Sequence, residues 1–554
     1  MKKTELLPKS RNAFVLGRSG DLFTCLPPGI PEVRSLPEDG LPDTVFLGEK
    51  DGPEGRQSLA ECFRKKIPFV IVGRGWSRGL PTYAGAGRPG TKIIGPGSAG
   101  LAESAPGPGG AIVLAAGSEI FKAVMGEAGK RSVPVEYGLS FGKKTDLDPM
   151  DAAWSLLGER RGGRLFLFIG RRLKRGRELL EFAAEAARSR SITAILEYDP
   201  LPGDDPVEAA ALRQMGIITV GEPSMAVDII ALHRAFAGEI PPGVFPDLGR
   251  GELGRLALGQ WGRRYAHFSK HEEPSFPCLK TAPGGEGLVV EGGSARVLIP
   301  EIGRGLDALS EVLGAGRFKS GLTGEKDGSL KCPIHPRPTE YDAKILLKTF
   351  GIPVARERLC RSFREAAEAA GSIGYPVAIK VMSPAILSKS DARVIALNLQ
   401  DEEELRNAYG RTLEKARKTN PGARIRGVLV QEMVRGGSEW RMEFRRDSRF
   451  GPVVEVSAAG VYGELLPDGV IRVAPFDREE ARAMILESRG RPLLSGGWMR
   501  EKLDAEAFAS ALSAFSRLAF CEREVSRLEV NPIFVNKKGV LVVDAFLELK
   551  GREK

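Results

Sequence analysis

The chain has 554 residues and a formal net charge of +10, and with 42% hydrophobic and 27% charged residues it can bury several cores. Its basic residues are scattered, only 7% of residues are aromatic, and no nucleic-acid-binding motif occurs, so we expect small anionic ligands such as nucleotides or CoA and no nucleic-acid partner. Six separated cysteines without a CxxC pair disfavour zinc and disulfides, and the lack of a signal-like start or a long apolar run predicts a cytoplasmic protein without a membrane span.

Residues 1–110 contain four short apolar runs that each end at glycine. They are "NAFVLGRSG", "DTVFLG", "PFVIVGRG" and "TKIIGPGSAG". Strands that stop at glycine, with loops beyond their carboxyl ends, are typical of an open parallel sheet that holds a ligand. A set of tight turns without any ligand is an equally weighted alternative for these glycines.

Residues 111–236 repeat the α/β pattern. "GAIVLAAGS", "RLFLFIG" and "ITAILEY" are predicted strands, and "RELLEFAAEAARSR" has the apolar spacing of a crossover helix. "MGIITVGEPSMAVDIIALHRAF" predicts a strand, a turn and a helix. Residues 237–335 are dense in proline and glycine, with "ARVLIPE" and "GLDALSEVLGAG" as the regular stretches, and we interpret them as a reduced domain or linker.

Residues 336–554 carry the clearest chemical pattern. "TEYDAKILLKTFGIPV" predicts a helix with a glycine stop, and "FREAAEAAGSIGYPVAIKV" predicts a helix followed by a strand that carries Lys380. "GVLVQEMV" predicts a strand, and "RLEVNPIFVNKKGVLVVDAFLEL" predicts a hairpin with Asn531 and Asp544 on its two arms. A lysine on a rigid strand suits phosphate, and two hard oxygens suit Mg²⁺. The alternative is a surface lysine and a plain Asn531–Pro532 turn.

These motifs resemble the ATP-grasp domain of the NDP-forming acyl-CoA synthetases, the relatives of succinyl-CoA synthetase. "GPGSAG" (95–100) and "SFGKKTDLD" (140–148) resemble the other domains of the same family. The resemblance implies an α/β fold with a Rossmann-like CoA-binding domain (1–110), a flavodoxin-like ligase domain (111–236) and a C-terminal ATP-grasp domain (336–554). It implies ATP or another NTP, Mg²⁺ and CoA as ligands.

The resemblance also implies site residues, position by position. For the nucleotide these are Lys380, Lys389, Glu432 and Glu439, and for the metal they are Asn531 and Asp544. For CoA they are Gly17, Ser19, Gly95, Pro96 and Ser98.

The groups that carry phosphate in the family are missing from this chain. Family members commonly read His-Lys-Ser-Asp-Val-Gly-Gly-Val where "AILSKSDARVIALNL" (385–399) stands, so Ser388 replaces the histidine and Arg393 and Val394 replace the glycines. Side chains there remove both the left-handed freedom and the close backbone approach of glycine. The family's phosphohistidine loop is absent from "DPLPGDDPVEA", and its glutamate falls at about Gly170. No catalytic residue is assigned.

Four histidines remain: His233, His267, His271 and His335. His233 falls on a predicted helix, where a packed or solvent-facing role is favoured. His267 and His271 are four residues apart and could share a helix face for a metal, but no third ligand accompanies them. None resembles the family's phosphate carrier.

Three functions follow from these observations. The first is an ADP-forming acyl-CoA ligase, which would need a relay from elsewhere, for example from a partner chain. The second is a degenerate paralogue that binds nucleotide and CoA and regulates or scaffolds an active homologue, with a homo-oligomer as a further option. The third is an ATP-grasp ligase that passes an acyl phosphate directly to another nucleophile.

Overall fold

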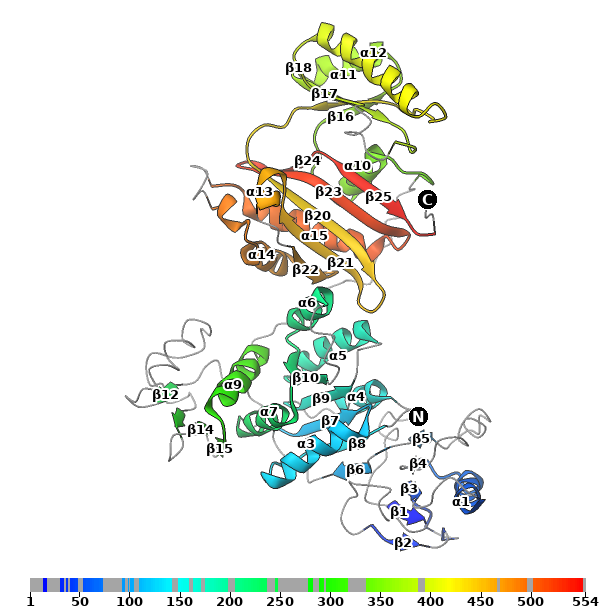
Figure 1. The fold of residues 1–554 in the computed structure, drawn as a ribbon, viewed down its shortest axis with the longest axis vertical. Helices are drawn as coiled ribbons and strands as arrows, with labels where there is room; N and C mark the ends of the chain where they lie inside the picture. The colour runs from blue at the N-terminus through cyan, green and yellow to red at the C-terminus, as the bar shows by residue number, and fades with distance from the viewer. Residues whose placement is uncertain are drawn as a thin grey trace. The chain divides into compact units, whose positions relative to one another are not determined.

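The computed structural model describes the chain in segments that together form two compact units (Figure 1). The described residues are 13–16, 30–33, 36–37, 40–47, 53–72, 92–94, 98, 100–103, 109–141, 148–158, 163–170, 175–197, 205–236, 245–247, 278–281, 288–292, 295–316, 335–386, 394–465, 469–495 and 502–551. The first unit comprises residues 1–205 and 212–320, and the second comprises 206–211 and 321–554.

The first sheet is wholly parallel, as the glycine-terminated runs predict. Its order is β2 (Glu32–Val33), β1 (Ala13–Leu16), β3 (Thr44–Leu47), β4 (Phe69–Val72) and β5 (Lys92–Ile94). Helix α1 (Pro53–Arg64) connects β3 to β4. Every residue of β3 and β4 is buried, which explains why these strands are continuous apolar runs without alternation.

The second sheet has the order β11 (Ile218–Val220), β10 (Ile192–Glu197), β9 (Leu165–Gly170), β7 (Ala111–Ala115), β8 (Tyr137–Ser140) and β6 (Gly100–Glu103). All pairs are parallel except β6 with β8. The helices are α3 (Ser118–Lys130), α4 (Pro149–Leu157), α5 (Gly176–Arg188), α6 (Pro206–Gln214) and α7 (Pro223–Ala235). The predicted crossover helix is α5, and it packs on β10. Residues 100–103, which fall within the range 1–110 predicted for the first domain, form β6 and pair with β8 in this second sheet.

The described parts of the stretch between residues 245 and 316 form regular structure that the sequence pattern only partly indicates. The strands β12 (Phe245–Asp247), β13 (Cys278–Thr281), β14 (Leu288–Gly292) and β15 (Ala295–Ile299) make a four-stranded sheet, and helix α9 (Ile302–Gly316) follows. Leu288, Val290 and Ile299 share one core with side chains of α7 and α9. This segment therefore packs against the second sheet's helices.

The second unit begins with a four-stranded sheet in the order β16 (Glu357–Cys360), β19 (Gly427–Glu432), β17 (Val377–Met382) and β18 (Ile395–Leu399). Helix α10 (Glu340–Thr349) precedes it, and α11 (Phe363–Ile373) and α12 (Glu402–Thr419) cover it. Gly351 ends the turn after α10 at φ +77°, as the predicted glycine stop requires. The helices and strands predicted here from the sequence are confirmed.

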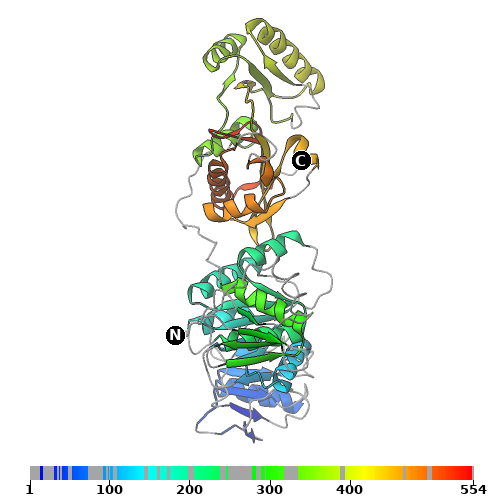
Figure 2. The same ribbon diagram turned by 90° about the vertical axis from the view of Figure 1, so that its left-hand side faces the viewer.

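A second, antiparallel sheet completes this unit (Figure 2). Its order is β22 (Val470–Val473), β21 (Gly451–Ala458), β20 (Ser438–Asp447), β23 (Val525–Asn536) and β24 (Gly539–Val542), and β25 (Ala545–Leu549) also pairs with β23. Helices α13 (Gly460–Leu465), α14 (Arg478–Glu487) and α15 (Ala505–Cys521) and the 3₁₀ turn η3 (Arg491–Leu493) lie between these strands in the chain. Helix α15 packs on β20, β21, β23 and β24. In the described part of the chain, no helix is long and apolar enough to cross a bilayer.

Candidate functional site

Helix α10 is fixed at its first turn by its own capping residues. The backbone N–H and the hydroxyl of Thr339 both donate to Asp342 Oδ2, at 2.7 Å each. Arg426, just before β19, donates to both oxygens of Asp342 at 2.6 and 3.2 Å. An acidic residue in this position satisfies free N–H groups and complements the helix dipole. The start of α10 is thereby attached to the sheet beside it.

The buried face of α10 carries charge as well as apolar side chains. Glu340, Ala343, Lys344 and Leu347 are all buried, and this spacing places them on one stripe of the helix. Lys344 donates to Glu340 Oε1 at 2.5 Å and to Glu357 Oε2 on β16 at 2.8 Å. Burial alone would lower the pKa of Lys344, but these two carboxylates outweigh it and raise that pKa. The helix therefore delivers a paired ammonium to the interior.

Lys380 is joined to the same carboxylate from β17. Its Nζ donates to Glu340 Oε1 at 2.7 Å and to the carbonyl oxygen of Val543 at 3.0 Å, and it lies 3.9 Å from Asp544 Oδ2. Gln431 on β19 donates to the same carbonyl at 3.1 Å. Burial lowers the pKa of Lys380, and Glu340 opposes that shift. The ammonium thus lies between two carboxylates, contributed by α10 and by the segment after β24.

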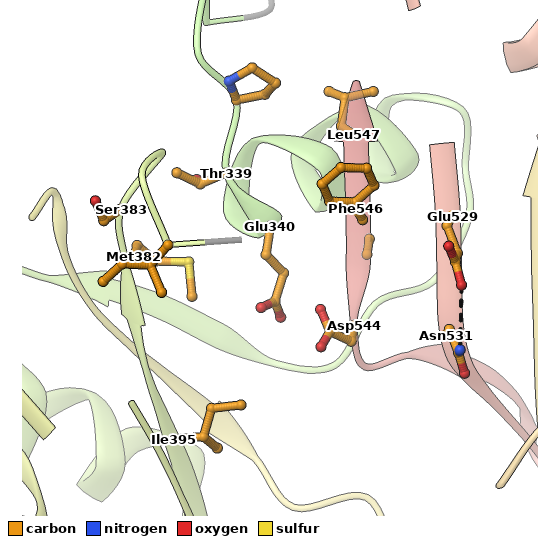
Figure 3. Close-up of a pocket in the computed structure, with 13 residues that line it drawn as sticks. Thr339, Glu340, Met382, Ser383, Ile395, Glu529, Asn531, Asp544, Phe546 and Leu547 are labelled. Carbon is orange, nitrogen blue, oxygen red and sulfur yellow. Dashed lines mark hydrogen bonds between the residues drawn. The ribbon is translucent and has the colours of Figure 1, made fainter. Parts of the chain in front are cut away.

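These carboxylates line a pocket of about 440 Å³. Its walls come from the start of α10, the ends of β17 and β18, and the strands β23 and β25 (Figure 3). In Figure 3 the carboxylates of Glu340 and Asp544 point toward each other. The lining residues are Pro338, Thr339, Glu340, Met382, Ser383, Ile386, Ile395, Glu529, Asn531, Asp544, Ala545, Phe546 and Leu547.

The polar wall opposite α10 is built by β23 and the segment before β25. The backbone N–H of Asn531 donates to the carbonyl oxygen of Asp544 at 3.1 Å, which brings the two side chains to one place. The Asn531 amide donates to Glu529 Oε1 at 3.4 Å. Glu529 is also bound by Arg441 at 2.8 Å and Arg527 at 2.7 Å. Burial alone would raise the pKa of Glu529, but the hydrogen bond from Arg441 outweighs it and lowers that pKa. Glu529 is therefore ionised, and this wall of the pocket carries a carboxylate.

The predicted nucleotide and metal residues are partly brought together. Asn531 and Asp544 line the pocket, and Lys380 is bound to Glu340 and lies 3.9 Å from Asp544 without lining the pocket itself. Glu432 ends β19 with both oxygens bound to Arg356, at 2.7 Å to the backbone N–H and 2.8 Å to Nε, and it does not line this pocket. Glu439 on β20 lies against Gly460, where an added Cβ would meet its Oε2 at 2.6 Å. Lys389 lies outside the described residues.

Of the residues predicted for CoA, only Ser98 is described. Its hydroxyl donates to the carbonyl oxygen of Ser140 at 2.5 Å and its backbone N–H donates to Val72 at 3.3 Å, so it ties the ends of β4 and β8 together. Gly17, Ser19, Gly95 and Pro96 lie outside the described residues. A role for Ser98 in CoA binding stays a prediction.

The histidines fall into two groups. His233 is fully buried on α7, with Nδ1 3.2 Å from the carbonyl oxygen of Gly109, which agrees with the packed role predicted for it. His335 is exposed and accepts the backbone N–H of Arg337 at 3.0 Å. His267 and His271 lie outside the described residues, as do Ser388 and Arg393 of the altered loop. No group of three or more metal-ligating His, Cys, Asp or Glu side chains occurs in the described segments.

Sequence reasoning missed the residues around the lysine. Glu340, Lys344, Glu357 and Gln431 were not named, and neither was Glu529 on the pocket wall. A usable signal was present, because Glu340 and Lys344 are charged residues four apart within the apolar stripe of α10. Charged residues at buried helical positions are expected to be paired and are candidates for a functional cluster.

Comparison with known proteins concerns the second unit. Residues 336–549 match the family model for an ATP-grasp domain. The chain is 40% identical over 215 residues to the β subunit of ADP-forming acetate–CoA ligase II from Pyrococcus furiosus, a match that covers 38% of this chain and 91% of that subunit. The corresponding ligase I β subunit is 36% identical over 216 residues, covering 39% and 93%.

Longer relatives match over a smaller share of their length. ADP-forming acetate–CoA ligase I from Archaeoglobus fulgidus is 39% identical over 199 residues, which cover 36% of this chain and 29% of that protein. Among solved structures, acetyl-coenzyme A synthetase 1 from Candidatus Korarchaeum cryptofilum, in complex with coenzyme A and Ca-AMPCP, is 38% identical with a TM-score of 0.37. That match covers 38% of this chain and 93% of the other.

Proposed function

Because the chain belongs to the family of NDP-forming acyl-CoA synthetases, we propose that its second unit binds ATP, or another nucleoside triphosphate, together with Mg²⁺. We propose further that the protein acts in the reaction of an acid with CoA and ATP that gives an acyl-CoA, ADP and phosphate. The β subunits named above are matched almost in full, whereas the longer relative from Archaeoglobus fulgidus is matched over 29% of its length.

One observation carries the nucleotide proposal. Lys380 is held within 3.9 Å of Asp544 at a pocket that Asn531 also lines. A fixed ammonium suits a polyphosphate, and an amide and a carboxylate oxygen suit Mg²⁺, which favours hard oxygen ligands and keeps several waters. The donor set therefore fits the metal, and Asn531 and Asp544 would hold it. The bound ion would neutralise phosphate charge.

Further residues complete the proposed nucleotide site. Glu432 lies at the end of β19 in one sheet of the second unit, and Glu439 lies on β20 in the other sheet. Lys389 lies in the sequence between β17 and β18. We assign them to the nucleotide by their match to the family motif. CoA would bind the first unit through Gly17, Ser19, Gly95, Pro96 and Ser98.

Calorimetric titration with Mg-ATP tests the nucleotide site. We expect saturable binding to the full chain, weakened at least about tenfold by Lys380→Met and by Asp544→Asn, because each removes one charge that meets the Mg-nucleotide. Lys348→Met is the matched control, since Lys348 is exposed on the same helix as Glu340. Unchanged binding in both pocket variants would refute the assignment.

A second candidate function is favoured by the substitutions in the phosphate-carrying loops. Ser388, Arg393 and Val394 stand where the resembling family has a histidine and two glycines. Val394 is buried in the core of the β16–β19 sheet, a position suited to packing. His233 is enclosed in the first unit, so it is unsuited to carry phosphate between sites. We propose as the alternative a paralogue without the relay that binds nucleotide and regulates or scaffolds an active homologue.

Labelled ATP separates the two candidates. An acid-labile phosphoprotein, together with acid-dependent and CoA-dependent release of ADP across a panel of acids, would support the self-sufficient ligase. Saturable ATP binding with neither phosphoprotein nor ADP release would support the regulatory paralogue. The measurement uses the full chain, and Asp544→Asn serves as the variant with a damaged nucleotide site.

A further inference from the structure

One carboxylate oxygen of the pocket-lining residue Glu340 is shared by two lysines. Glu340 Oε1 accepts from Lys344 at 2.5 Å and from Lys380 at 2.7 Å. The three side chains are almost fully buried, with Lys344 and Glu340 at 0% and Lys380 at 5% exposure. Lys344 has a second carboxylate partner in Glu357 at 2.8 Å, also at 0% exposure. Charges buried to this degree interact much more strongly than surface pairs.

The cluster has one part at the pocket, Glu340 and Lys380, and one part away from it, Lys344 and Glu357. Glu340 lines the pocket, and Lys380 lies between it and Asp544. Lys344 binds Glu340 and Glu357, and neither Lys344 nor Glu357 lines the pocket. Gln431 connects the two parts, because Lys344 donates to its Oε1 at 3.4 Å while its amide donates to the carbonyl of Val543, which also accepts from Lys380.

We propose that Lys344 and Glu340 are positioning residues that set the place and the effective charge of the Lys380 ammonium for the phosphates of the bound nucleotide. This inference rests on the proposed nucleotide site and adds to it a pair of residues on α10. The fold fixes the carboxylate partners of both lysines. The ion pair between Asp342 and Arg426 attaches α10 to the sheet, so α10 cannot shift relative to β17 and β19 without breaking that pair.

The physical reason is that the single negative charge of Glu340 is shared between two ammonium groups, those of Lys344 and Lys380. A buried carboxylate that faced Lys380 alone would cancel its charge locally and leave little attraction for phosphate. Because Lys344 binds the same oxygen, Lys380 is neutralised incompletely. Glu357 balances Lys344, so two ammonium groups and two carboxylates stay paired in the interior. Lys344 therefore increases the attraction of Lys380 for phosphate without touching the ligand.

The test is the double variant Lys344→Met/Glu357→Gln in the full chain. It removes one positive and one negative buried charge together, which leaves Glu340 paired with Lys380 and avoids an unpaired buried carboxylate. We expect ATP and ADP to bind about tenfold more weakly, because Glu340 then neutralises Lys380 fully. Adenosine, which has no phosphate, should bind as it does to the unaltered protein.

Glu357→Gln alone is the matched variant with the opposite expectation. Lys344 then has only Glu340 as its carboxylate partner, so ATP should bind at least as tightly as it binds the unaltered protein. Thermal unfolding of each variant establishes that it is folded during the titration. A loss shared by ATP and adenosine would indicate a merely structural role and overturn the proposal.

Two further outcomes separate this inference from the function on which it rests. Unaltered ATP and ADP affinity in the double variant would overturn the positioning role while the nucleotide site stands. A failure of the unaltered protein to bind Mg-ATP at all would overturn the proposed nucleotide site, and the positioning role with it.

Discussion

His233 is a buried imidazole with one satisfied nitrogen. Nδ1 lies at hydrogen-bonding distance from the carbonyl oxygen of Gly109, and Nε2 is buried without a partner among the described residues. Burial lowers the pKa of His233 from 6.5 to about 4; the hydrogen bond to Gly109 opposes that shift, and nearby Arg234 adds to it. The neutral form is therefore the one that fits the folded first unit.

Acid should destabilise the first unit through this residue. Because the folded pKa lies below the unfolded value, the stabilisation is complete above pH 6.5 and is lost as the pH falls towards about 4. We expect His233→Gln, whose amide can still donate to Gly109, to remove up to about 3 kcal/mol of this pH dependence. Denaturant unfolding at a series of pH values measures it. Exposed His335→Gln is the control, and equal pH profiles for the unaltered protein and His233→Gln would contradict the expectation.

At the level of single residues, the sequence predicts the groups that would meet the ligand better than those that support them. Lys380, Asn531 and Asp544 could be proposed from the sequence because their motif and hard-ligand chemistry are local in the chain. Glu340 and Glu357 could not be recognised locally, because β17 brings Lys380 to Glu340 and β16 brings Glu357 to Lys344 of α10; the Glu340–Lys380 contact spans 40 residues. Glu432 is a residue that the motif assigns to the nucleotide, but in the structure its side chain is bound to Arg356.

The connection between β19 and β20 joins the two sheets of the second unit through two glycines of different character. Gly436 has φ +76° and Gly437 has φ +91°, so both adopt backbone that disfavours side chains. A Cβ on Gly437 would lie 2.2 Å from the carbonyl oxygen of Val535, whereas one on Gly436 would meet nothing within 4 Å. Only Gly437 therefore packs its backbone directly against β23.

Alanine at these two positions should have unequal effects. We expect Gly436→Ala to cost about 1 kcal/mol of unfolding free energy, from the left-handed backbone alone. Gly437→Ala should cost about 3 kcal/mol, because β20 must also move away from β23. Denaturant unfolding of the two variants under the same conditions measures the difference. Equal losses of unfolding free energy in the two variants would show that the new Cβ at position 437 is accommodated beside Val535 without further cost.

Elements were predictable where one pattern dominated. The crossover helix α5 shows apolar spacing, and β3 and β4 are continuous apolar runs because both faces are buried. The strand β12 was not predictable, since the three residues of Phe245–Asp247 contain a proline and depend on pairing with β13. The hairpin was predicted as two arms, but its second arm is divided into β24 and β25, with Asp544 between them.

The molecule consists of two compact units, and the second carries its own cores. The two hydrophobic clusters of its sheets contain only residues from 343 to 549. The relatives that are β subunits are matched over 91% and 93% of their length, and residues 336–549 match the ATP-grasp family model. The sequence patterns predict a boundary at residue 336, because a proline- and glycine-rich stretch there precedes a strongly periodic helix.

A fragment of residues 321–554 should therefore fold and bind without the rest of the chain. We expect one cooperative thermal transition and an affinity for Mg-ATP within about threefold of the full chain, because the pocket and both cores are internal to it. A matched fragment that starts at residue 351 lacks α10, and with it Glu340, Lys344 and the core residues Leu346 and Leu347. That shorter fragment should lose both the cooperative transition and nucleotide binding. If the longer fragment also unfolds gradually, the first unit must contribute to the stability of the second, since the cores of the second unit would then be insufficient by themselves.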